Sequence, residues 1–348
     1  MMGGNTTNTR VQRMSIELIT TEPEFQALRG DWNSLVELSA SRVPFLRHEF
    51  LASWWQTLGG GEWQKGELSI LTHQDPSGNL DGIAPLFRHD GRVLFLGSHE
   101  ISDYLDFIAP AAQLGKVISD FFGFMREGAF PEWKVLDFYN LLDSSPSLPF
   151  IRQAAREYGF SLQEEVIQPA PYINLPASWE AYLDGLAARY RRDIERKIAN
   201  ADSYFLPVSW YIANDPINLD SELDDFLGLM ANHPEKESFL TTEMIGQIKS
   251  SSRAAFNAGW LQLAFLKVGD IKAAGYLNFD YDGQIWVYNS GINSLFENIS
   301  PGWVLLGKII RWAIDEGKSK LDFMRGDETY KYQFGGIDKK VLRLQITP

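Results

Sequence analysis

A short stretch near the C-terminal end, residues 320–335, carries charged and aromatic side chains suited to group transfer. Its carboxylates can orient or deprotonate a nucleophilic amine or hydroxyl, and its cations can hold a phosphate or a carboxylate. The six candidates are Asp322, Arg325, Asp327, Glu328, Tyr330 and Lys331. The alternative is a salt-bridged surface turn in which Arg325 and Lys331 only neutralise the acids.

A second group of acids lies in the first half of the chain, at Asp103 and Asp106, with Tyr104 between them. Their neighbours are apolar, so each carboxylate needs a partner or must face a cleft. The alternative is a loop in which one of the two acids caps the backbone.

A third candidate site is the start of a predicted helix, at Ser300, Pro301, Gly302 and Trp303. Pro301 suits the first helical position and Ser300 can act as the N-cap. A helix N-terminus offers unpaired N–H groups and the positive end of the helix dipole, and Gly302 would let a pyrophosphate approach the backbone. The alternative is an ordinary capped helix that binds nothing.

A predicted helix and a predicted strand precede the charged residues of the C-terminal stretch and indicate where they lie in the fold. Apolar residues recur at helical spacing over 301–316, and Gly317 suits the helix end. A short strand over 321–324 follows and then breaks at Arg325. Open α/β sheets place ligands at the carboxyl ends of their strands, so the charged residues after this strand are expected to face a site.

The two halves of the chain echo one another, which predicts two α/β halves packed around a shared cleft. Residues 114–118 (LGKVI) resemble 306–310 (LGKII), and Leu-Asp-Phe occurs at both 136–138 and 321–323. A short linker with three prolines near 169–176 separates the halves. The expected divisions are a disordered tail at 1–14, an N-terminal half at 15–172 and a C-terminal half at 173–348.

Composition excludes several classes of function. The 348 residues carry a formal net charge of −13, which argues against broad binding of DNA or of an anionic membrane surface. The chain has no cysteine, its five histidines show no metal-ligand spacing, and no metal is expected. No apolar run reaches the roughly 18 residues of a membrane span, and residues 1–13 lack the apolar centre of a secretory signal. A cytoplasmic protein is therefore expected, with an unknown oligomeric state.

Several stretches together resemble the CelD-type acetyltransferases of the GNAT superfamily, relatives of the Fem peptidoglycan aminoacyltransferases. The matching stretches are PFLRHEFLASWW (44–55), SDYLDF (102–107), 171–198, SPGWVLLGKIIRWAIDEG (300–317) and LDFMRGDETYKYQFG (321–335). The resemblance implies two tandem GNAT-like halves around one cleft. It also implies transfer of an acyl group, with acetyl expected, from acyl-CoA to an amine or hydroxyl, and it hints at an acceptor on a polysaccharide or cell-envelope precursor.

The resemblance also assigns parts to residues. In GNAT proteins the loop entering the helix after the fourth strand cradles the CoA pyrophosphate, and by position this loop is Ser300 to Trp303. The usual glycine-richer loop is absent, so an aminoacyl or other activated donor stays open. The family has no universally assigned catalytic base, so the catalytic candidates come from the residue types themselves, as acids expected to face one another across the cleft. They are Asp322 and Asp327 on the second half and Asp103 and Asp106 on the first. The expected substrate-binding residues are Tyr104, Arg325, Glu328, Tyr330 and Lys331.

Two other functions remain open from the sequence. One is a Fem-like aminoacyltransferase that uses aminoacyl-tRNA, although an acidic chain is a poor match for tRNA. The other is an inactive GNAT scaffold that binds a glycan or protein partner.

Overall fold

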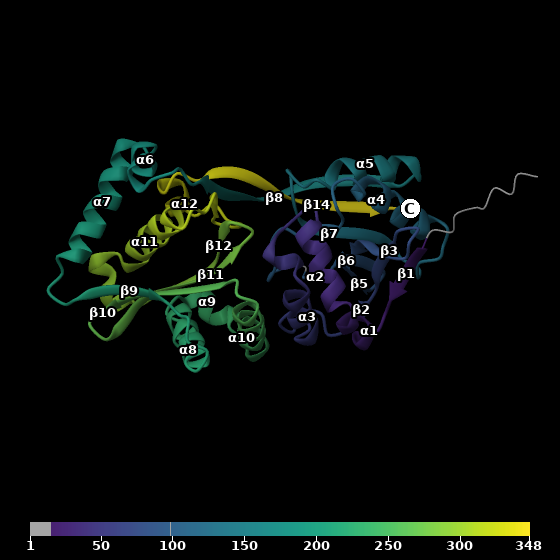
Figure 1. Ribbon diagram of the computed structural model, residues 1–348. Coiled ribbons are helices and arrows are strands. Elements are labelled where there is room, and N and C mark those ends of the chain that lie inside the picture. The colour runs from purple at the N-terminus through teal and green to yellow at the C-terminus, as the bar shows by residue number, and fades with distance from the viewer. Residues whose placement is uncertain (1–14, 98) are drawn as a thin grey trace, which may run out of the picture.

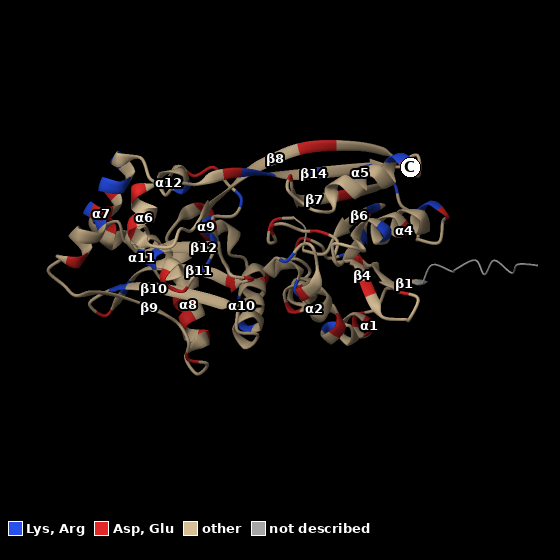
Figure 2. Cartoon of the chain, turned by 45° about the horizontal axis from the view of Figure 1, so that its top comes forward, with Lys and Arg blue, Asp and Glu red and all other residues tan. Residues whose placement is uncertain are grey.

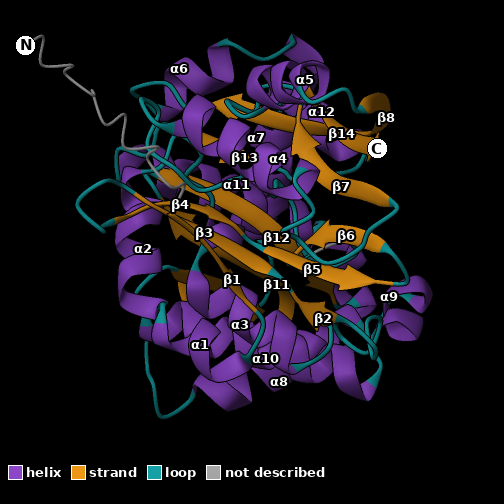
Figure 3. Ribbon diagram, turned by 90° about the vertical axis from the view of Figure 1, so that its right-hand side faces the viewer, coloured by secondary structure: helices purple, strands orange, loops and turns teal. Residues whose placement is uncertain are grey.

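The computed structural model describes residues 15–97 and 99–348, so the predicted tail at 1–14 lies outside the described residues. The chain forms two lobes joined by two long strands, β8 and β14, which run from one lobe to the other (Figure 1). Helices lie on both faces of the strands (Figure 3). None of the helices in the described part of the chain is both long enough and apolar enough to cross a membrane.

The N-terminal lobe contains the elements from β1 to α5. Its strands are β1 (Ser15–Ile19), β2 (Glu67–Leu68), β3 (Ile70–Gln74), β4 (Leu80–Ala84), β5 (Leu86–His89), β6 (Arg92–Phe95) and β7 (Val135–Leu142). Its helices are α1 (Glu22–Ala27), α2 (Arg29–Leu38), the 3₁₀ turn η1 (Pro44–Leu46), α3 (His48–Gln56), α4 (Leu114–Arg126) and α5 (Leu148–Glu157).

The C-terminal lobe contains the elements from α6 to α12. Its helices are α6 (Trp179–Asp184), α7 (Ala188–Asp202), α8 (Leu219–Met230), α9 (Pro234–Phe239), α10 (Thr242–Asn257), the 3₁₀ segment η2 (Ser294–Ile299), α11 (Pro301–Asp315) and α12 (Thr329–Gln333). Its strands are β9 (Val208–Ile212), β10 (Leu261–Val268), β11 (Ile271–Tyr281), β12 (Gln284–Ile292) and β13 (Lys320–Asp322). The two strands shared by both lobes are β8 (Ser161–Asn174) and β14 (Ile337–Thr347).

One sheet of 11 strands runs through both lobes in the order β2-β5-β6-β7-β14-β8-β13-β12-β11-β10-β9, beside a 3-stranded sheet β1-β3-β4. Strand β14 lies between β7 and β8 and is antiparallel to both. The last strand of the chain therefore completes the sheet of the N-terminal lobe. The expected division at residues 172 and 173 falls inside β8, whose backbone pairs with β13 at one end and with β14 along its length.

The repeated order of elements predicted from the sequence is present in the fold. The unit β6–α4–β7 and the unit β12–α11–β13 each join two parallel strands through one helix. Leu-Asp-Phe lies on β7 in the first unit, while in the second β13 ends at Asp322 and Phe323 follows it. The prediction of two α/β halves is confirmed.

Apolar side chains fix both units and also join the lobes. Helix α11 buries Val304, Leu305, Ile309 and others against the sheet of the C-terminal lobe. The lobes share a continuous core in which Phe45 packs edge-on against Phe279 at 5.8 Å between ring centroids. Such burial is worth about 1.5–3 kcal/mol per large side chain, so the lobes are held against each other by packing as well as by strands.

Candidate functional site

The site begins where two parallel strands of the C-terminal lobe diverge. Strands β12 and β13 pair only from Gln284 opposite Lys320 to Trp286 opposite Asp322. Beyond this point β12 runs on to Ile292, while the chain after Asp322 turns toward β8, where the Phe323 N–H donates to the Pro171 carbonyl at 2.9 Å. No described strand pairs with this edge of β12 beyond Trp286. In this segment the Ser290 carbonyl accepts from Lys236 and the Ile292 carbonyl accepts from Asn232, and the absence of a partner strand leaves room for a ligand along the edge.

Strand β12 carries a bulge just beyond the point where its pairing with β13 ends. Across β11 and β12, Asn278 is opposite Val287 and Leu277 is opposite Asn289, which leaves Tyr288 as the extra residue on β12. Its hydroxyl donates to the Ile101 carbonyl of the N-terminal lobe at 2.7 Å. Bulges bend a strand and redirect its side chains, and here the redirected tyrosine reaches the other lobe.

Two cavities occupy the space between the diverging strands. The first, which we call the interlobe cavity, has a volume of ≈ 300 Å³ and is walled by both lobes. Its charged lining residues are Glu100, Asp103, Lys236, Arg325, Glu328 and Lys331. The second, the helix cavity, has a volume of ≈ 420 Å³ and includes the first residues of α11. Lys236, Ser290 and Tyr330 line both cavities, so the two meet at these side chains.

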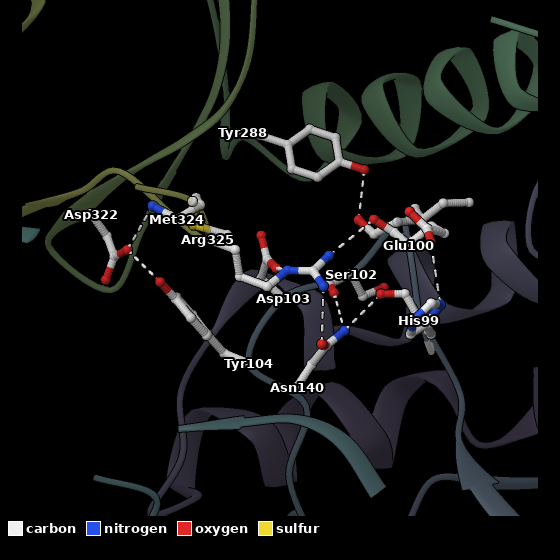
Figure 4. A network of polar contacts seen from close by, with 12 residues as sticks. His99, Glu100, Ser102, Asp103, Tyr104, Asn140, Tyr288, Asp322, Met324 and Arg325 are labelled. Atoms are coloured by element: carbon white, nitrogen blue, oxygen red, sulfur yellow. Dashed lines mark hydrogen bonds and ion pairs between the residues drawn. The ribbon is translucent and has the colours of Figure 1, made fainter. Parts of the chain in front are cut away.

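Arg325 crosses from the C-terminal lobe into the N-terminal lobe (Figure 4). Its guanidinium forms an ion pair with Asp103 and donates to the Asn140 Oδ1 at 3.1 Å and to the Glu100 carbonyl at 3.0 Å. Burial raises the pKa of the Asp103 carboxyl, and Arg325 opposes that rise. The predicted acid Asp103 and the predicted cation Arg325 are therefore direct partners on the wall of the interlobe cavity.

Asp322 lies behind this wall and is fully buried, at 0 % exposure. Its carboxylate accepts from the Tyr104 hydroxyl at 2.7 Å, from the Met324 N–H at 2.9 Å and from the Lys339 ammonium at 2.8 Å. Both Tyr104 (φ 58°) and Met324 (φ 63°) have left-handed backbone conformations that cost energy for residues with a side chain. Asp322 thus holds one strained residue from each lobe. Burial, with the nearby Asp322 charge, raises the pKa of Tyr104 well above its ordinary value.

Lys331 fixes the loop that follows β13. Its ammonium is 2 % exposed and donates to three successive carbonyls, those of Met324 (3.2 Å), Arg325 (2.6 Å) and Gly326 (3.3 Å). It also pairs with Glu328 at 2.9 Å. The loop wraps around a buried cation, and this requires the turn at Gly326 (φ 114°).

Two of the predicted acids lie apart from this cluster. Asp106 is buried and accepts from the Ser145 hydroxyl and from the Phe107 N–H, both at 2.8 Å, and burial raises its pKa. Asp327 is exposed and lies outside the residues that line the two cavities. The other predicted site residues of this region, Asp103, Tyr104, Asp322, Arg325, Glu328, Tyr330 and Lys331, are brought together at the interlobe cavity or directly behind it.

The start of α11 lines the helix cavity as a group of four residues, from Ser300 to Trp303. Ser300 is the N-cap residue, but its φ of 51° turns it away from a capping geometry and its side chain makes no capping hydrogen bond, which corrects that expectation. A Cβ on Gly302 would lie 2.7 Å from the Ile292 side chain, so the glycine lets β12 and α11 approach. The Lys197 ammonium lies 3.5 Å from the centre of the Trp303 ring and adds a cation to the same cavity.

Lys236 was not singled out by the sequence analysis. It lies on the short helix α9, and its ammonium donates to the Ser290 carbonyl at 2.5 Å. Burial lowers its pKa. The His233-Pro234 pair indicates that a helix begins here, as α9 does. It does not indicate that Lys236, in the first turn of this helix, contacts Ser290 on β12. Across the described residues, no group of three or more His, Cys, Asp or Glu side chains is placed to hold a metal ion.

The chain was compared with protein families and with solved structures, and both comparisons found similarities. Residues 188–332 match the family model described as an acetyltransferase (GNAT) domain. No curated protein matches the chain in sequence. The crystal structure of FemX is similar with a TM-score of 0.65 at 11% identity, over 95% of this chain and 97% of that one.

Two other solved structures are similar over most of their length. One is L-PGS from Bacillus licheniformis, with a TM-score of 0.56 at 10% identity, over 94% of this chain and 92% of that one. The other is a conserved protein of unknown function from Bacteroides thetaiotaomicron VPI-5482, with a TM-score of 0.57 at 12% identity, over 96% of this chain and 100% of that one. The chain thus has a fold similar to that of FemX along nearly its whole length, and its residues 188–332 match an acetyltransferase domain of the GNAT type.

Proposed function

We propose that this protein is an acyltransferase that moves an acyl group, with acetyl as the first candidate, from acyl-CoA to an amine or hydroxyl. The observation that carries the proposal is the meeting of two cavities where β12 and β13 diverge, one at a helix N-terminus and one between the lobes. Two substrates that enter from the two cavities would meet at Lys236, Ser290 and Tyr330. The family match of residues 188–332 supports this class of reaction.

The helix cavity is the proposed donor site. The N–H groups at the start of α11 and the Lys197 ammonium would hold the phosphates of CoA. The unpaired edge of β12 beyond Trp286 would hydrogen-bond the amides of the pantetheine arm and direct the thioester toward Ser290. The helix cavity therefore needs only to bind and orient the donor. Binding and orientation by themselves supply much of the rate enhancement in two-substrate reactions.

The interlobe cavity is the proposed acceptor site. Its carboxylates, Glu100, Asp103 and Glu328, would attract an amine as its cation. A base first takes a proton from the bound ammonium, and the neutral nitrogen, or a hydroxyl oxygen in its place, attacks the thioester carbonyl. The C–S bond then breaks, and the CoA thiolate leaves with the proton that the attacking nitrogen or oxygen gives up. Of the four acids proposed as bases, Asp103 lines this cavity, whereas Asp322 would position Tyr104 and the Met324 loop. An acceptor on a polysaccharide or cell-envelope precursor, as in the CelD-type resemblance, is the finer form of this proposal.

A Fem-like aminoacyltransferase is the second candidate, and the similarity to the fold of FemX favours it. Helix α7, which borders the helix cavity through Lys197, carries four arginines that a tRNA backbone could meet. Acids are interspersed among them (Figure 2), and Arg191 pairs with Asp184 and Glu195 while Arg196 pairs with Asp193. These pairs weaken the attraction for a polyanion, so acyl-CoA is the preferred donor.

The test crosses a panel of acyl-CoA donors with sugar, amine and amino-acid acceptors and measures released CoA. Thermal unfolding with each donor is measured alongside, because a ligand that binds only the folded state raises the midpoint. Release of CoA that depends on an acceptor supports the proposal. Transfer from aminoacyl-tRNA without transfer from any acyl-CoA would replace it by the second candidate. A protein that no donor stabilises would be an inactive scaffold for a glycan or protein partner.

A further inference from the structure

A third cavity lies at the seam between the lobes, outside the proposed acyl-transfer site. This seam cavity has a volume of ≈ 410 Å³. Its walls include Ser41, Arg42, Asp106, Ser144 and Ser145 from the N-terminal lobe, and Tyr172, Asp282, Gln284, Trp286, Lys320 and Lys339 from the shared strands and the C-terminal lobe. Trp286 lines the seam cavity and the next residue, Val287, lines the interlobe cavity. The two cavities therefore approach each other along β12, but they share no lining residue.

Two lysines converge on one aromatic ring in the seam cavity. The ammonium of Lys320 lies 5.1 Å and that of Lys339 4.8 Å from the centre of the Tyr172 ring. Lys339 has a counter-ion, since it pairs with Asp322 at 2.8 Å. No carboxylate among the described residues forms an ion pair with Lys320. Burial and the neighbouring charge of Lys339 lower the pKa of Lys320, and the charge of Asp322, which pairs with Lys339, opposes this shift only in part.

The other charged groups of the cavity are already engaged. Arg42 faces Asp282 at 3.4 Å, and Asp106 accepts hydrogen bonds from Ser145 and from the Phe107 N–H. Burial raises the pKa of both carboxyls; Arg42 opposes the rise at Asp282, and hydrogen bonds from Ser145 and the Phe107 N–H oppose it at Asp106. The hydroxyl of Ser144 and the amide of Gln284 add neutral hydrogen-bonding groups. Among the lysines and arginines that line this cavity in the described part of the chain, Arg42 and Lys339 form ion pairs and Lys320 does not.

We propose that the seam cavity binds a compact dianion, a phosphate group or a small dicarboxylate, between Lys320 and Lys339. The ligand would supply the counter-ion that Lys320 lacks, and charge-assisted hydrogen bonds to two ammonium groups would hold it. Tyr172 and Trp286 would close the sides of the site. This inference is independent of the acyl-transfer proposal and concerns a different cavity.

Such a ligand would be connected to the proposed acceptor site through one side chain, the carboxylate of Asp322. Lys339 contacts Asp322, and Asp322 in turn holds Tyr104 of one lobe and Met324 of the other. An anion that shares Lys339 with Asp322 would therefore be placed at the joint between the lobes. Occupancy is expected to stabilise the folded protein and to raise its unfolding midpoint.

Titration of the full chain with inorganic phosphate tests the site. Binding is measured by calorimetry and by thermal unfolding, with chloride at the same ionic strength as the control, and with a phosphomonoester and malonate as the two ligand sources. Lys320→Gln removes the unpartnered cation and leaves the Lys339–Asp322 pair intact, so this variant is expected to fold. Lys340→Gln, an exposed lysine two positions beyond Asp338 on β14, makes the same change in charge outside the cavity.

The expected result is one phosphate bound per chain in the wild type and in Lys340→Gln. In Lys320→Gln its affinity should fall at least about fivefold. Equal affinity in the wild type and Lys320→Gln would overturn the proposal, because phosphate would then bind elsewhere, for example at α11. No binding of phosphate, phosphomonoester or malonate by the wild type would overturn it as well. Neither outcome bears on release of CoA, so this inference and the acyl-transfer proposal can fail separately.

Discussion

Asp137 and Asp322 occupy matching places in the two repeated units, and both are buried, at 1 % and 0 % exposure. Asp137 on β7 accepts four hydrogen bonds, between 2.7 and 3.1 Å, from Arg92 on β6 and Arg343 on β14. All three of these strands are neighbours in the sheet of the N-terminal lobe. Asp322 instead receives Lys339 from β14 and Tyr104 from the opposite lobe.

The same Leu-Asp-Phe sequence therefore serves two purposes. In the N-terminal lobe the carboxylate holds three strands together, and its arginine partners are about one quarter to one third exposed. In the C-terminal lobe the carboxylate holds the joint between the lobes and the loop that lines the interlobe cavity. The difference shows that a repeated acid can be structural in one copy and placed beside a site in the other.

The largest expected effect is on stability, from Asp322→Asn. The change leaves the Lys339 ammonium, whose side chain is 13 % exposed, without its counter-ion. Removing one partner of a buried pair costs about 3–5 kcal/mol. Urea unfolding measures the loss. A loss no larger than that of Asp137→Asn would remove the distinction between the two acids.

The next effect is catalytic and depends on the acyl-transfer proposal. Asp103→Asn is expected to lower kcat by at least about a hundredfold, within the range for a general base. The carboxylate must be ionised to act, so wild-type activity should fall as pH drops through the raised pKa of Asp103, and the variant should lack that fall. Retention of wild-type activity between about pH 6 and 9 by Asp103→Asn, with the same pH profile, would exclude Asp103 as the base.

A smaller loss of stability is expected from Asp137→Asn, about 1–3 kcal/mol, since water can solvate the two arginines that it leaves. Burial raises the pKa of Asp137, but Arg343 and Arg92 hold it below its ordinary value of 3.8. Its contribution is therefore complete above pH 3.8 and is lost as pH falls further, through the folded-state pKa. Unfolding of both proteins at neutral and acidic pH measures this, and the difference between them should shrink in acid. A constant difference would show that the charge is not the source of the stability.

The smallest effect is expected from substitutions at the second residues of the two equivalent helices, Gly302 in α11 and Gly115 in α4. A side chain on Gly302 would meet Ile292 on the wall of the helix cavity, whereas one on Gly115 would meet the Phe150 ring at 2.8 Å. Gly302→Val is expected to weaken acyl-CoA binding about tenfold, or ~1.4 kcal/mol. Gly115→Val should lower stability and leave the affinity unchanged. Equal donor affinity in both variants and the wild type would exclude the start of α11 as the donor site.

Local patterns predicted much of the fold. The apolar spacing over 301–316 corresponds to α11 within one residue at its end. The strand at Leu321 and the turn at Arg325 also follow from adjacent residue types. These features depend on neighbours in sequence, which a single chain displays directly.

The partners of the charged residues could not be predicted in the same way. Arg325 and Lys331 do pair with acids, but Arg325 meets Asp103 of the other lobe and Lys331 meets Glu328. Asp322 pairs with Lys339, which lies 17 residues further along the chain and outside the charged stretch at 320–335. These contacts depend on how β14 is inserted and on how the lobes pack, and neither has a local signal. Whether any of the acids acts as a base stays a prediction.

The position of β14 sets the order in which the protein can be completed during synthesis. Residues 337–347 leave the ribosome after every other strand of this sheet, yet they lie between β7 and β8, which are made much earlier. Until then both strands present an unpaired edge, a state open to pairing with other chains. The N-terminal lobe is thus translated before the C-terminal lobe, but its sheet and the seam between the lobes are completed only when β14 has been made.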